Sequence, residues 1–170
     1  MDQIEIERSE VWRRLTTTVD GTPKKLAGDP HKLALMQRLV DRYYDHRRGN
    51  WEPEIGEAWH PDDWRGRLRE QYPGLDAGMD FERGWADIMS AGASLAADAG
   101  QDFGISYGKE KFGMMSLFPT HWPEGDLDGL EDAMERLSTK ICEVCGAPGR
   151  NRSTRGWWRT TCDRHAEDQQ

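Results

Sequence analysis

The chain has 170 residues, of which 36% are hydrophobic and 32% are charged. This length allows one domain with a buried core, with or without a small appended module, and eight tryptophans exclude a disordered chain. No apolar run approaches the roughly twenty residues that a membrane span requires, and the N-terminus shows no signal-peptide pattern. We therefore expect neither a membrane segment nor secretion.

The first half of the sequence predicts helices. Residues 3–17 place four apolar side chains among charged neighbours, as in an amphipathic helix: Ile4, Val11, Trp12 and Leu15. Asp29 is a suitable N-cap and Pro30 suits the first position of a second helix, which continues to about Arg47. Its apolar residues recur at three- and four-residue steps: Leu33, Met36, Leu39, Val40, Tyr43 and Tyr44. Pro61 is expected to open a shorter helix.

The middle of the chain predicts a helix followed by two strands. Asp80 is expected to cap a helix whose apolar stripe has nearly ideal spacing. Residues 103–107 then alternate between apolar and polar side chains, and a second apolar run over residues 112–118 is expected to stop at Pro119. With a turn at residues 108–110, the two runs form a β-hairpin.

A last helix is expected to lead directly into a metal motif, because the apolar residues of 127–141 have helical spacing and end just before Cys142. The predicted fold class is α+β. It comprises N-terminal helices over residues 1–75, a central helix–β-hairpin–helix body over 76–141, and a C-terminal zinc ribbon or treble clef over 142–170. We expect these parts to form one compact unit.

All three cysteines belong to one pattern, Cys142-Glu-Val-Cys145 followed after sixteen residues by Cys162-Asp-Arg-His165. Two such pairs complete a tetrahedron of three thiolates and one imidazole, which is typical of structural zinc. We predict that these four residues bind one Zn²⁺. Four protein ligands leave no open position, so a structural role is favoured over catalysis or a redox switch. Thiols kept for a metal also indicate a reducing compartment, and we expect a cytoplasmic protein.

Charge is distributed unevenly along the chain, with a net +4 over residues 140–165 and −10 over residues 1–139. Between the two ligand pairs, four arginines accompany two tryptophans: Arg150, Arg152, Arg155, Arg159, Trp157 and Trp158. Guanidinium groups beside aromatic rings suit phosphates and stacked bases, but they suit an acidic protein surface equally well. In a third interpretation, a cation–π pairing only stiffens the finger, Trp157 packs on the zinc turn, and the arginines keep the loop soluble. The short Gly149–Gly156 loop is expected to be mobile enough for all three interpretations.

No other motif indicates catalysis. The triplet Lys109-Glu110-Lys111 could supply a catalytic pair, but alternating charges at a predicted turn are normally solvated. The sequence contains no glycine-rich phosphate loop, serine elbow or metalloprotease motif. A treble-clef nuclease would need a histidine base beside the finger, and the nearest histidine outside the motif, His121, lies beyond it. We therefore expect no enzymatic activity.

Three motifs lie between Tyr72 and Ala166: Gly84-Trp85, Lys109-Glu110-Lys111-Phe112-Gly113, and Cys142 to Gly149 followed by Gly156-Trp157, Thr160 and Cys162 to His165. In this combination the chain resembles a family of small, largely uncharacterised bacterial and phage zinc-finger proteins. Where those relatives usually have Leu-Arg, this chain has Met115-Ser116. The resemblance implies the fold and the metal site, and it implies no activity.

The function that we expect is a non-enzymatic protein-interaction module, an adaptor or an inhibitor, with one structural zinc. Its acidic body could occupy a basic groove by imitating nucleic acid. A phage or mobile element acting on a host defence complex, such as a CRISPR effector, is the setting that we hypothesise. The first alternative is a nucleic-acid-binding regulator that uses the basic segment, and the second is a metal-dependent nuclease.

Overall fold

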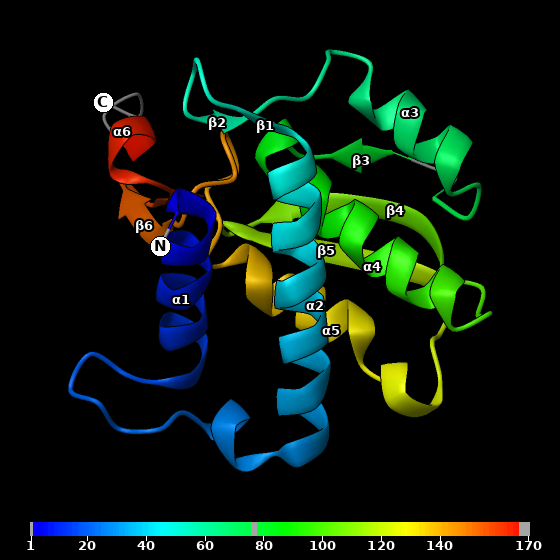
Figure 1. Ribbon diagram of the computed structural model, residues 1–170, viewed down its shortest axis with the longest axis horizontal. Coiled ribbons are helices and arrows are strands. Elements are labelled where there is room, and N and C mark those ends of the chain that lie inside the picture. The colour runs from blue at the N-terminus through cyan, green and yellow to red at the C-terminus, as the bar shows by residue number, and fades with distance from the viewer. Residues whose placement is uncertain (1, 76–77, 167–170) are drawn as a thin grey trace.

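A computed structural model describes residues 2–75 and 78–166 of the chain. The fold is α+β: helices cover one face of a central sheet, and a C-terminal module (residues 142–166) lies at one end of it (Figure 1). The helices are α1 (Gln3–Thr16), α2 (Pro30–Gly49), α3 (Trp64–Gln71), α4 (Ala86–Asp98), α5 (Leu130–Ser138) and α6 (Asp163–Ala166). The strands are β1 (Trp51–Glu52), β2 (Glu57–Ala58), β3 (Met79–Asp80), β4 (Gly104–Lys111), β5 (Met114–His121), β6 (Arg150–Thr154) and β7 (Trp157–Thr161).

The N-terminal helices begin close to where the sequence predicts. Asp2 accepts a hydrogen bond from the backbone N–H of Glu5, and Asp29 accepts one from Lys32, so each aspartate caps a helix. The inward stripe of α2 is buried: Leu35, Met36, Leu39, Val40, Tyr43 and Tyr44. Because α1 packs along this helix, the first half of the chain contributes directly to the common core.

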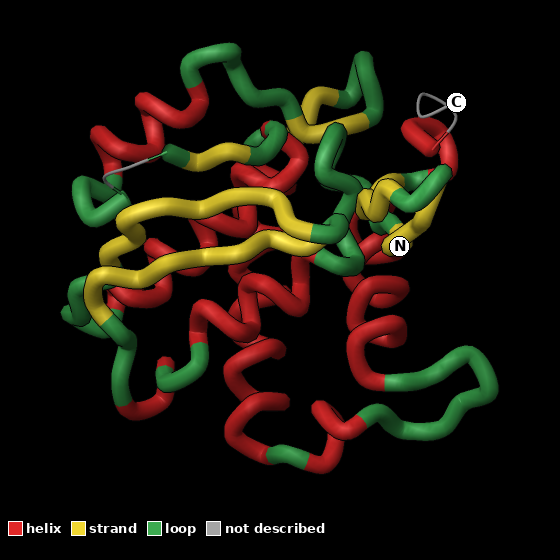
Figure 2. Tube along the Cα trace, turned by 180° about the vertical axis from the view of Figure 1, so that it is seen from behind, coloured by secondary structure: helices red, strands yellow, loops and turns green. Residues whose placement is uncertain are grey.

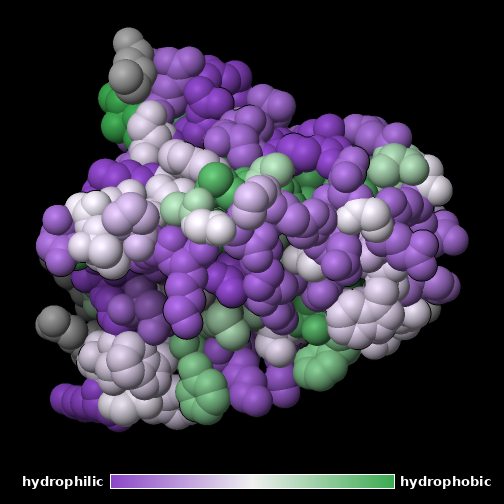
Figure 3. Space-filling view, turned by 90° about the horizontal axis from the view of Figure 1, so that it is seen from below, coloured by the Kyte–Doolittle hydropathy of each residue, from purple (hydrophilic) through white to green (hydrophobic). Residues whose placement is uncertain are grey.

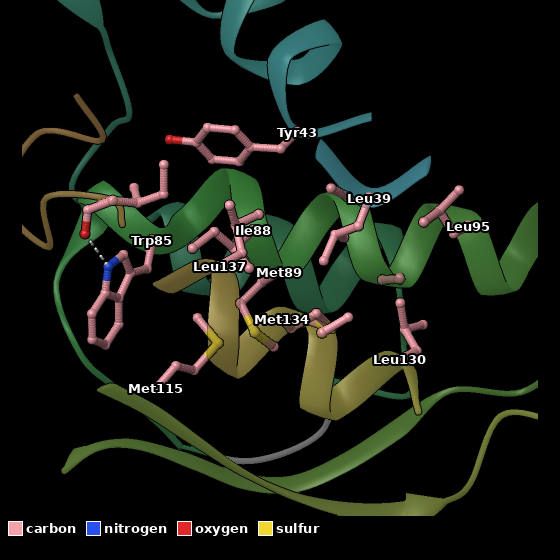
Figure 4. Close-up of a cluster of buried hydrophobic side chains, with 14 of the residues drawn as sticks. Leu39, Tyr43, Trp85, Ile88, Met89, Leu95, Met115, Leu130, Met134 and Leu137 are labelled. Atoms are coloured by element: carbon pink, nitrogen blue, oxygen red, sulfur yellow. Dashed lines mark hydrogen bonds between the residues drawn. The ribbon is translucent and has the colours of Figure 1, made fainter. Parts of the chain in front are cut away.

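Helix α4 is the centre of that core. It lies between α2 on one side and α5 and the sheet on the other (Figure 4). All eleven residues from Ala86 to Ala96 are buried. At Gly92 an added Cβ would lie 2.4 Å from the sulfur of Met134, so the glycine allows α5 to approach closely. A helix that is buried on all sides needs such small residues where its neighbours cross.

The expected start of α4 is wrong. Asp80 does not cap the helix, because it lies in β3 and pairs in parallel with Lys109. A 3₁₀ turn over Arg83–Trp85 follows, and α4 begins at Ala86. The short β3 was not predicted, because its pairing depends on a strand about thirty residues further along the chain.

The central hairpin exists, but its turn lies later than expected. Residues 108–110 belong to β4, and the turn is formed by Phe112 and Gly113, with φ of 55° and 79°. Strand β5 also continues through Pro119. The strand order is β3-β4-β5, which places β5 at an edge, where a proline need not break the ladder.

In the part of the chain that the structure describes, helices cover one face of the central sheet and leave the other open. Figure 2 shows β4 and β5 from the side opposite to Figure 1, with the helices behind them. Side chains that point to the helices are buried, as Ile105, Met115 and Leu117 are. The opposite side, called the outer face here, carries Tyr107, Lys109, Lys111, Met114, Ser116 and Phe118.

The face shown in Figure 3 is mostly hydrophilic, with apolar groups between polar ones. Among the described residues, eleven large hydrophobic side chains are exposed, and six of them lie on the β4–β5 and β6–β7 hairpins. The hairpins are therefore the regions where exposed apolar groups gather. Within the described residues, no helix combines the length and apolar character needed to cross a membrane.

Candidate metal centre

The four residues of the cysteine–histidine pattern come together in the C-terminal module. Cys142 and Cys145 lie in the turn after α5, whereas Cys162 precedes α6 and His165 lies within it. Their ligand atoms all lie within 4.8 Å of one another, so the group could hold a metal ion, as predicted. The order of turn, β-hairpin and short helix favours a treble clef over a ribbon.

The distances suit a tetrahedral ion. Typical zinc–ligand bond lengths place two sulfurs about 3.8 Å apart, and a sulfur and a nitrogen about 3.5 Å apart. The Sγ atoms of Cys145 and Cys162 are 3.8 Å apart, and Nδ1 of His165 lies 3.3 Å from Cys162 Sγ. The Sγ atom of Cys142 is 3.6 Å from the same nitrogen, and all three cysteines are free. The donor set and its spacing therefore fit one ion.

Backbone hydrogen bonds shape the turn that carries Cys142 and Cys145, which is called the metal-ligand turn here. The N–H of Cys142 donates to the carbonyl of Ala147, and the N–H of Gly146 donates to the carbonyl of Cys142. Gly146 has φ of 81°, and a Cβ there would lie 2.7 Å from Nη1 of Arg47 and 3.1 Å from the hydroxyl of Tyr43. Both the backbone conformation and the lack of space exclude a side chain at this position.

The thiols differ in proton affinity because they are so close together. A hydrogen bond with Cys145 lowers the pKa of the Cys142 thiol to about 4. The same contact and burial raise the pKa of Cys145, and burial raises that of Cys162. The group can therefore offer one thiolate to a cation, and loss of the other protons is coupled to metal binding.

A buried arginine connects the ligand turn to the N-terminal helices. Arg47 of α2 is 1% exposed and pairs with Glu7 of α1 at 2.8 Å. Its guanidinium also donates to the carbonyl of Cys145 at 3.1 Å. The buried charge of Arg47 is thus satisfied by Glu7 of α1 and by the metal-ligand turn. The position of that turn therefore depends on α1 and α2.

Two buried aromatic residues reinforce this connection. The hydroxyl of Tyr43 donates to the carbonyl of Gly146 at 2.8 Å, and the indole N–H of Trp85 donates to the carbonyl of Ile141 at 2.9 Å. Each bond satisfies a polar atom inside the core. The C-terminal module therefore rests on α2 and on the start of α4 as well as on α5.

The basic segment is a β-hairpin, and the prediction of a mobile Gly149–Gly156 loop is wrong. Strands β6 and β7 pair antiparallel, with Arg152 opposite Arg159. Arg155 and Gly156 form the two-residue turn, with φ of 53° and 84°. Such turns favour residues that tolerate positive φ. Because an arginine occupies the first position, the sequence did not indicate a hairpin turn here.

The four arginines do not form one free basic cluster. Arg152 pairs with Asp163 at 2.6 Å, and Arg159 lies 3.8 Å from Glu143. Two have no ion-pair partner among the described residues: Arg150 and Arg155. Only half of the predicted basic contacts are therefore free for a phosphate or an acidic surface.

The two tryptophans face solvent. Trp157 is 78% exposed and Trp158 is 44% exposed. The interpretation in which Trp157 packs on the metal-ligand turn is therefore wrong. Large rings are normally buried or kept for a partner, and here the fold leaves both open.

The two hairpins are in direct contact, which sequence reasoning did not predict. The side-chain amide of Asn151 donates to the carbonyl of Phe112 at 3.2 Å, and the hydroxyl of Thr160 donates to the carbonyl of Gly113 at 2.5 Å. Trp158 shares the strand face of Thr160, because side chains two residues apart point to the same side. The C-terminal module thus holds the turn that carries Phe112.

A second polar cluster, which sequence reasoning missed, lines a cleft of about 510 Å³ between α2, α3 and α4. The buried carboxylate of Asp87 accepts from Asn50 at 2.9 Å and lies 3.1 Å from Nε2 of His60. His46 bonds instead to Ser90 at 2.7 Å, and burial lowers the pKa of its imidazole. Because the serine and the aspartate contact different histidines, these groups do not form a proton relay. Their separation along the chain leaves no motif to recognise.

A nuclease would need a histidine beside the metal-ligand residues, and His121 was the nearest candidate in the sequence. His121 ends β5, whose first residue, Met114, follows the turn held by the C-terminal module. Seven residues of extended strand separate them by about 23 Å. His121 is therefore remote from the metal-ligand residues.

Comparison of the chain with protein-family models, with curated proteins and with solved structures finds no match. The resemblance to small bacterial and phage zinc-finger proteins stays a prediction.

Proposed function

We propose that the protein is a non-enzymatic interaction module in which one structural Zn²⁺ holds the β6–β7 hairpin against the body. Cys142, Cys145, Cys162 and His165 would complete the coordination of the ion. A zinc ion with four protein ligands supplies folding free energy and offers no position to a substrate. Thiols kept for a metal suit the reducing cytoplasm, where we propose that the protein acts.

A macromolecular partner would bind the exposed rings of the two hairpins, which are called the aromatic face here: Tyr107, Phe112, Phe118, Trp157 and Trp158. Trp158 points to the side of β7 that Thr160 occupies, and Trp157 points to the other side. The observation that carries the proposal is the exposure of rings on two hairpins that contact each other: Phe112 is 71% exposed and Trp157 is 78% exposed. Phe112 also adopts a left-handed conformation, with φ of 55°, which costs a bulky residue about 1–2 kcal/mol. An exposed ring held in a strained turn supports a role in binding, because it adds nothing to the core.

The acidic body is a weaker candidate for the contact surface. Among the described residues, eight acidic side chains of the first hundred already pair with arginines of this protein: Asp2, Glu7, Glu10, Asp41, Glu57, Asp63, Glu82 and Asp98. Paired carboxylates present less negative charge to a basic groove. We therefore propose that the contact surface lies on the hairpins. This applies whether the protein is an adaptor or inhibitor or a nucleic-acid-binding regulator.

Partner capture from a lysate of the native host, with tagged variants, tests this assignment. Trp157→Ser/Trp158→Ser should lose a discrete partner that the wild type retains. The control Trp59→Ser removes a tryptophan that is 51% exposed but lies outside the hairpins, and it should retain the partner. Loss with both variants, or with neither, contradicts the proposal. Zinc content and thermal unfolding establish that each variant is folded.

A further inference from the structure

We infer that the partner on the aromatic face is a single-stranded nucleic acid, with bases stacked on the rings and phosphates bound by Lys109 and Lys111 of the neighbouring outer face. This inference rests on the proposed function, since it names the partner class of the same surface. It depends on three features of the outer face: open rings, cations without carboxylate partners, and an extended shape.

Rings and amines line the outer face. Tyr107 of β4 lies opposite Phe118 of β5, and their ring centroids are 6.3 Å apart. The next outward pair is Lys109 opposite Ser116, which leaves the lysine uncrowded. Two residues further along β4 a second lysine precedes the Phe112 turn. The face therefore offers a ring, an amine, an amine and a ring in succession, uncovered by helices (Figure 2).

Both lysines lie over rings. Asp80 of β3 is the cross-strand neighbour of Lys109, but its carboxylate accepts from the hydroxyl of Tyr107 at 3.3 Å. Lys109 Nζ is 5.8 Å from the ring centroid of Phe118, and Lys111 Nζ is 5.8 Å from that of Phe112. Neither lysine has an ion-pair partner in the part of the chain that the structure describes, although the sequence carries 31 acidic residues. An ammonium held only by an exposed ring keeps its charge available to a phosphate, and the ring keeps a face for a base.

An extended surface of this kind suits unpaired bases. A base can stack on a protein ring only when it has left its own duplex stack. The eight-residue strands β4 and β5 are about 26 Å long, which is room for several nucleotides. The outer face presents strands, not a helix, so it lacks the element that most often reads the major groove of a duplex.

The net charge of −8 limits affinity but does not exclude the interaction. The unpaired cations Lys109 and Lys111 lie close together on β4, and Arg155 adds a third on the β6–β7 hairpin. About three phosphate contacts give a slope near −2 in a plot of log affinity against log salt. Affinity should then fall roughly 20-fold between 50 and 200 mM salt.

Fluorescence anisotropy of the full-length, zinc-loaded protein with labelled twelve-nucleotide oligo-dT or oligo-U tests the inference. A mixed-sequence duplex of the same length should bind at least about tenfold more weakly. Lys109→Gln/Lys111→Gln should weaken binding about tenfold or more and flatten the salt slope by roughly 1.4. The control Lys25→Gln/Lys32→Gln removes the same charge from exposed positions near the start of α2, and it should change little.

Phe118→Ser removes a stacking ring and leaves both lysines, so it should weaken binding about tenfold while the salt slope stays the same. Absence of single-strand binding at 50 mM salt, or equal effects of the two lysine pairs, overturns the inference. A captured partner that requires Trp157 and Trp158 but survives nuclease would be a protein, and then this inference fails while the proposed function stands. Capture that is indifferent to both tryptophans overturns the two together.

Discussion

Helix α4 and the β6–β7 hairpin keep their shapes by different means. In α4 every residue from Ala86 to Ala96 is buried, whereas in the hairpin only Thr160 and Thr161 are. Apolar burial at about 25 cal/mol per Å² stabilises the helix. The hairpin has almost no core of its own and depends on backbone pairing, on contacts with the turn at Phe112, and on the metal-ligand residues.

This difference explains where a binding surface can form. Side chains of α4 are committed to packing, so any change there affects the fold. The hairpin side chains are not needed for packing, because hydrogen bonds and the proposed zinc hold its backbone. Trp157 and Trp158 are therefore free to face a partner. The predictions below separate these two kinds of stability.

The largest effect is expected from loss of the metal. Cys145→Ser should remove one equivalent of zinc and cost several kcal/mol, because structural zinc supplies on the order of 10 kcal/mol in isolated fingers. Amide hydrogen exchange should show lost protection in β6 and β7 and retained protection in α4. The control Val144→Ala lies in the same turn but offers no ligand, and it should keep the metal. Wild-type protein that purifies without metal and still unfolds cooperatively would contradict the proposed zinc site.

The next largest effect is expected at the link between the two regions. Arg47→Ala leaves Glu7 buried without its partner, which typically costs about 3–5 kcal/mol. It also frees the carbonyl of Cys145, so zinc should be lost to a chelator more readily. The neighbouring Arg48 pairs with Asp2 at the surface, and Arg48→Ala should change the melting temperature little.

A double-mutant cycle sharpens this result. Glu7→Leu combined with Arg47→Met removes both charges and should recover most of the stability that either single change loses. The cycle is measured by denaturant unfolding. Additive losses would show that the ion pair does not couple α1 to the ligand turn.

The metal pattern could be predicted from the sequence because its signal is local. Cys142 and Cys145 are separated by two residues, and so are Cys162 and His165. Helix α2 was predictable for a similar reason, since Asp29 caps it within one turn. In both cases the residues that determine the structure lie next to each other in the chain.

The features that escaped prediction depend on distant contacts. Phe112 is an unfavourable residue for positive φ, and its turn is contacted by Asn151, nearly forty residues later, whose side-chain amide donates to its carbonyl. The sequence therefore pointed to Gly108 for the turn. The pairing of Asp80 with Lys109 also joins remote segments, and nothing near Asp80 distinguishes a strand from a helix cap.

The smallest effect in this series is expected at Gly84, where the start of α4 touches the ligand turn. A Cβ at this position would lie 2.3 Å from the carbonyl oxygens of Cys142 and Glu143, and the N–H of Gly84 donates to the latter at 2.8 Å. Gly84→Ala must therefore displace backbone, at a cost of about 1–3 kcal/mol. Gly66→Ala in α3 meets nothing within 4 Å and should be neutral or stabilising by up to about 1 kcal/mol.

Zinc competition distinguishes a contact between the regions from simple core strain. If α4 positions the ligand turn, Gly84→Ala should lower both the melting temperature and the affinity for zinc. Ile88→Ala, a cavity in α4 away from the turn, should cost about 2–5 kcal/mol at a buried site and leave the zinc affinity unchanged. If Gly84→Ala and the wild type bind zinc equally well, the metal-ligand turn keeps its geometry without the helix. The backbone that the new methyl group displaces would then lie entirely on the α4 side.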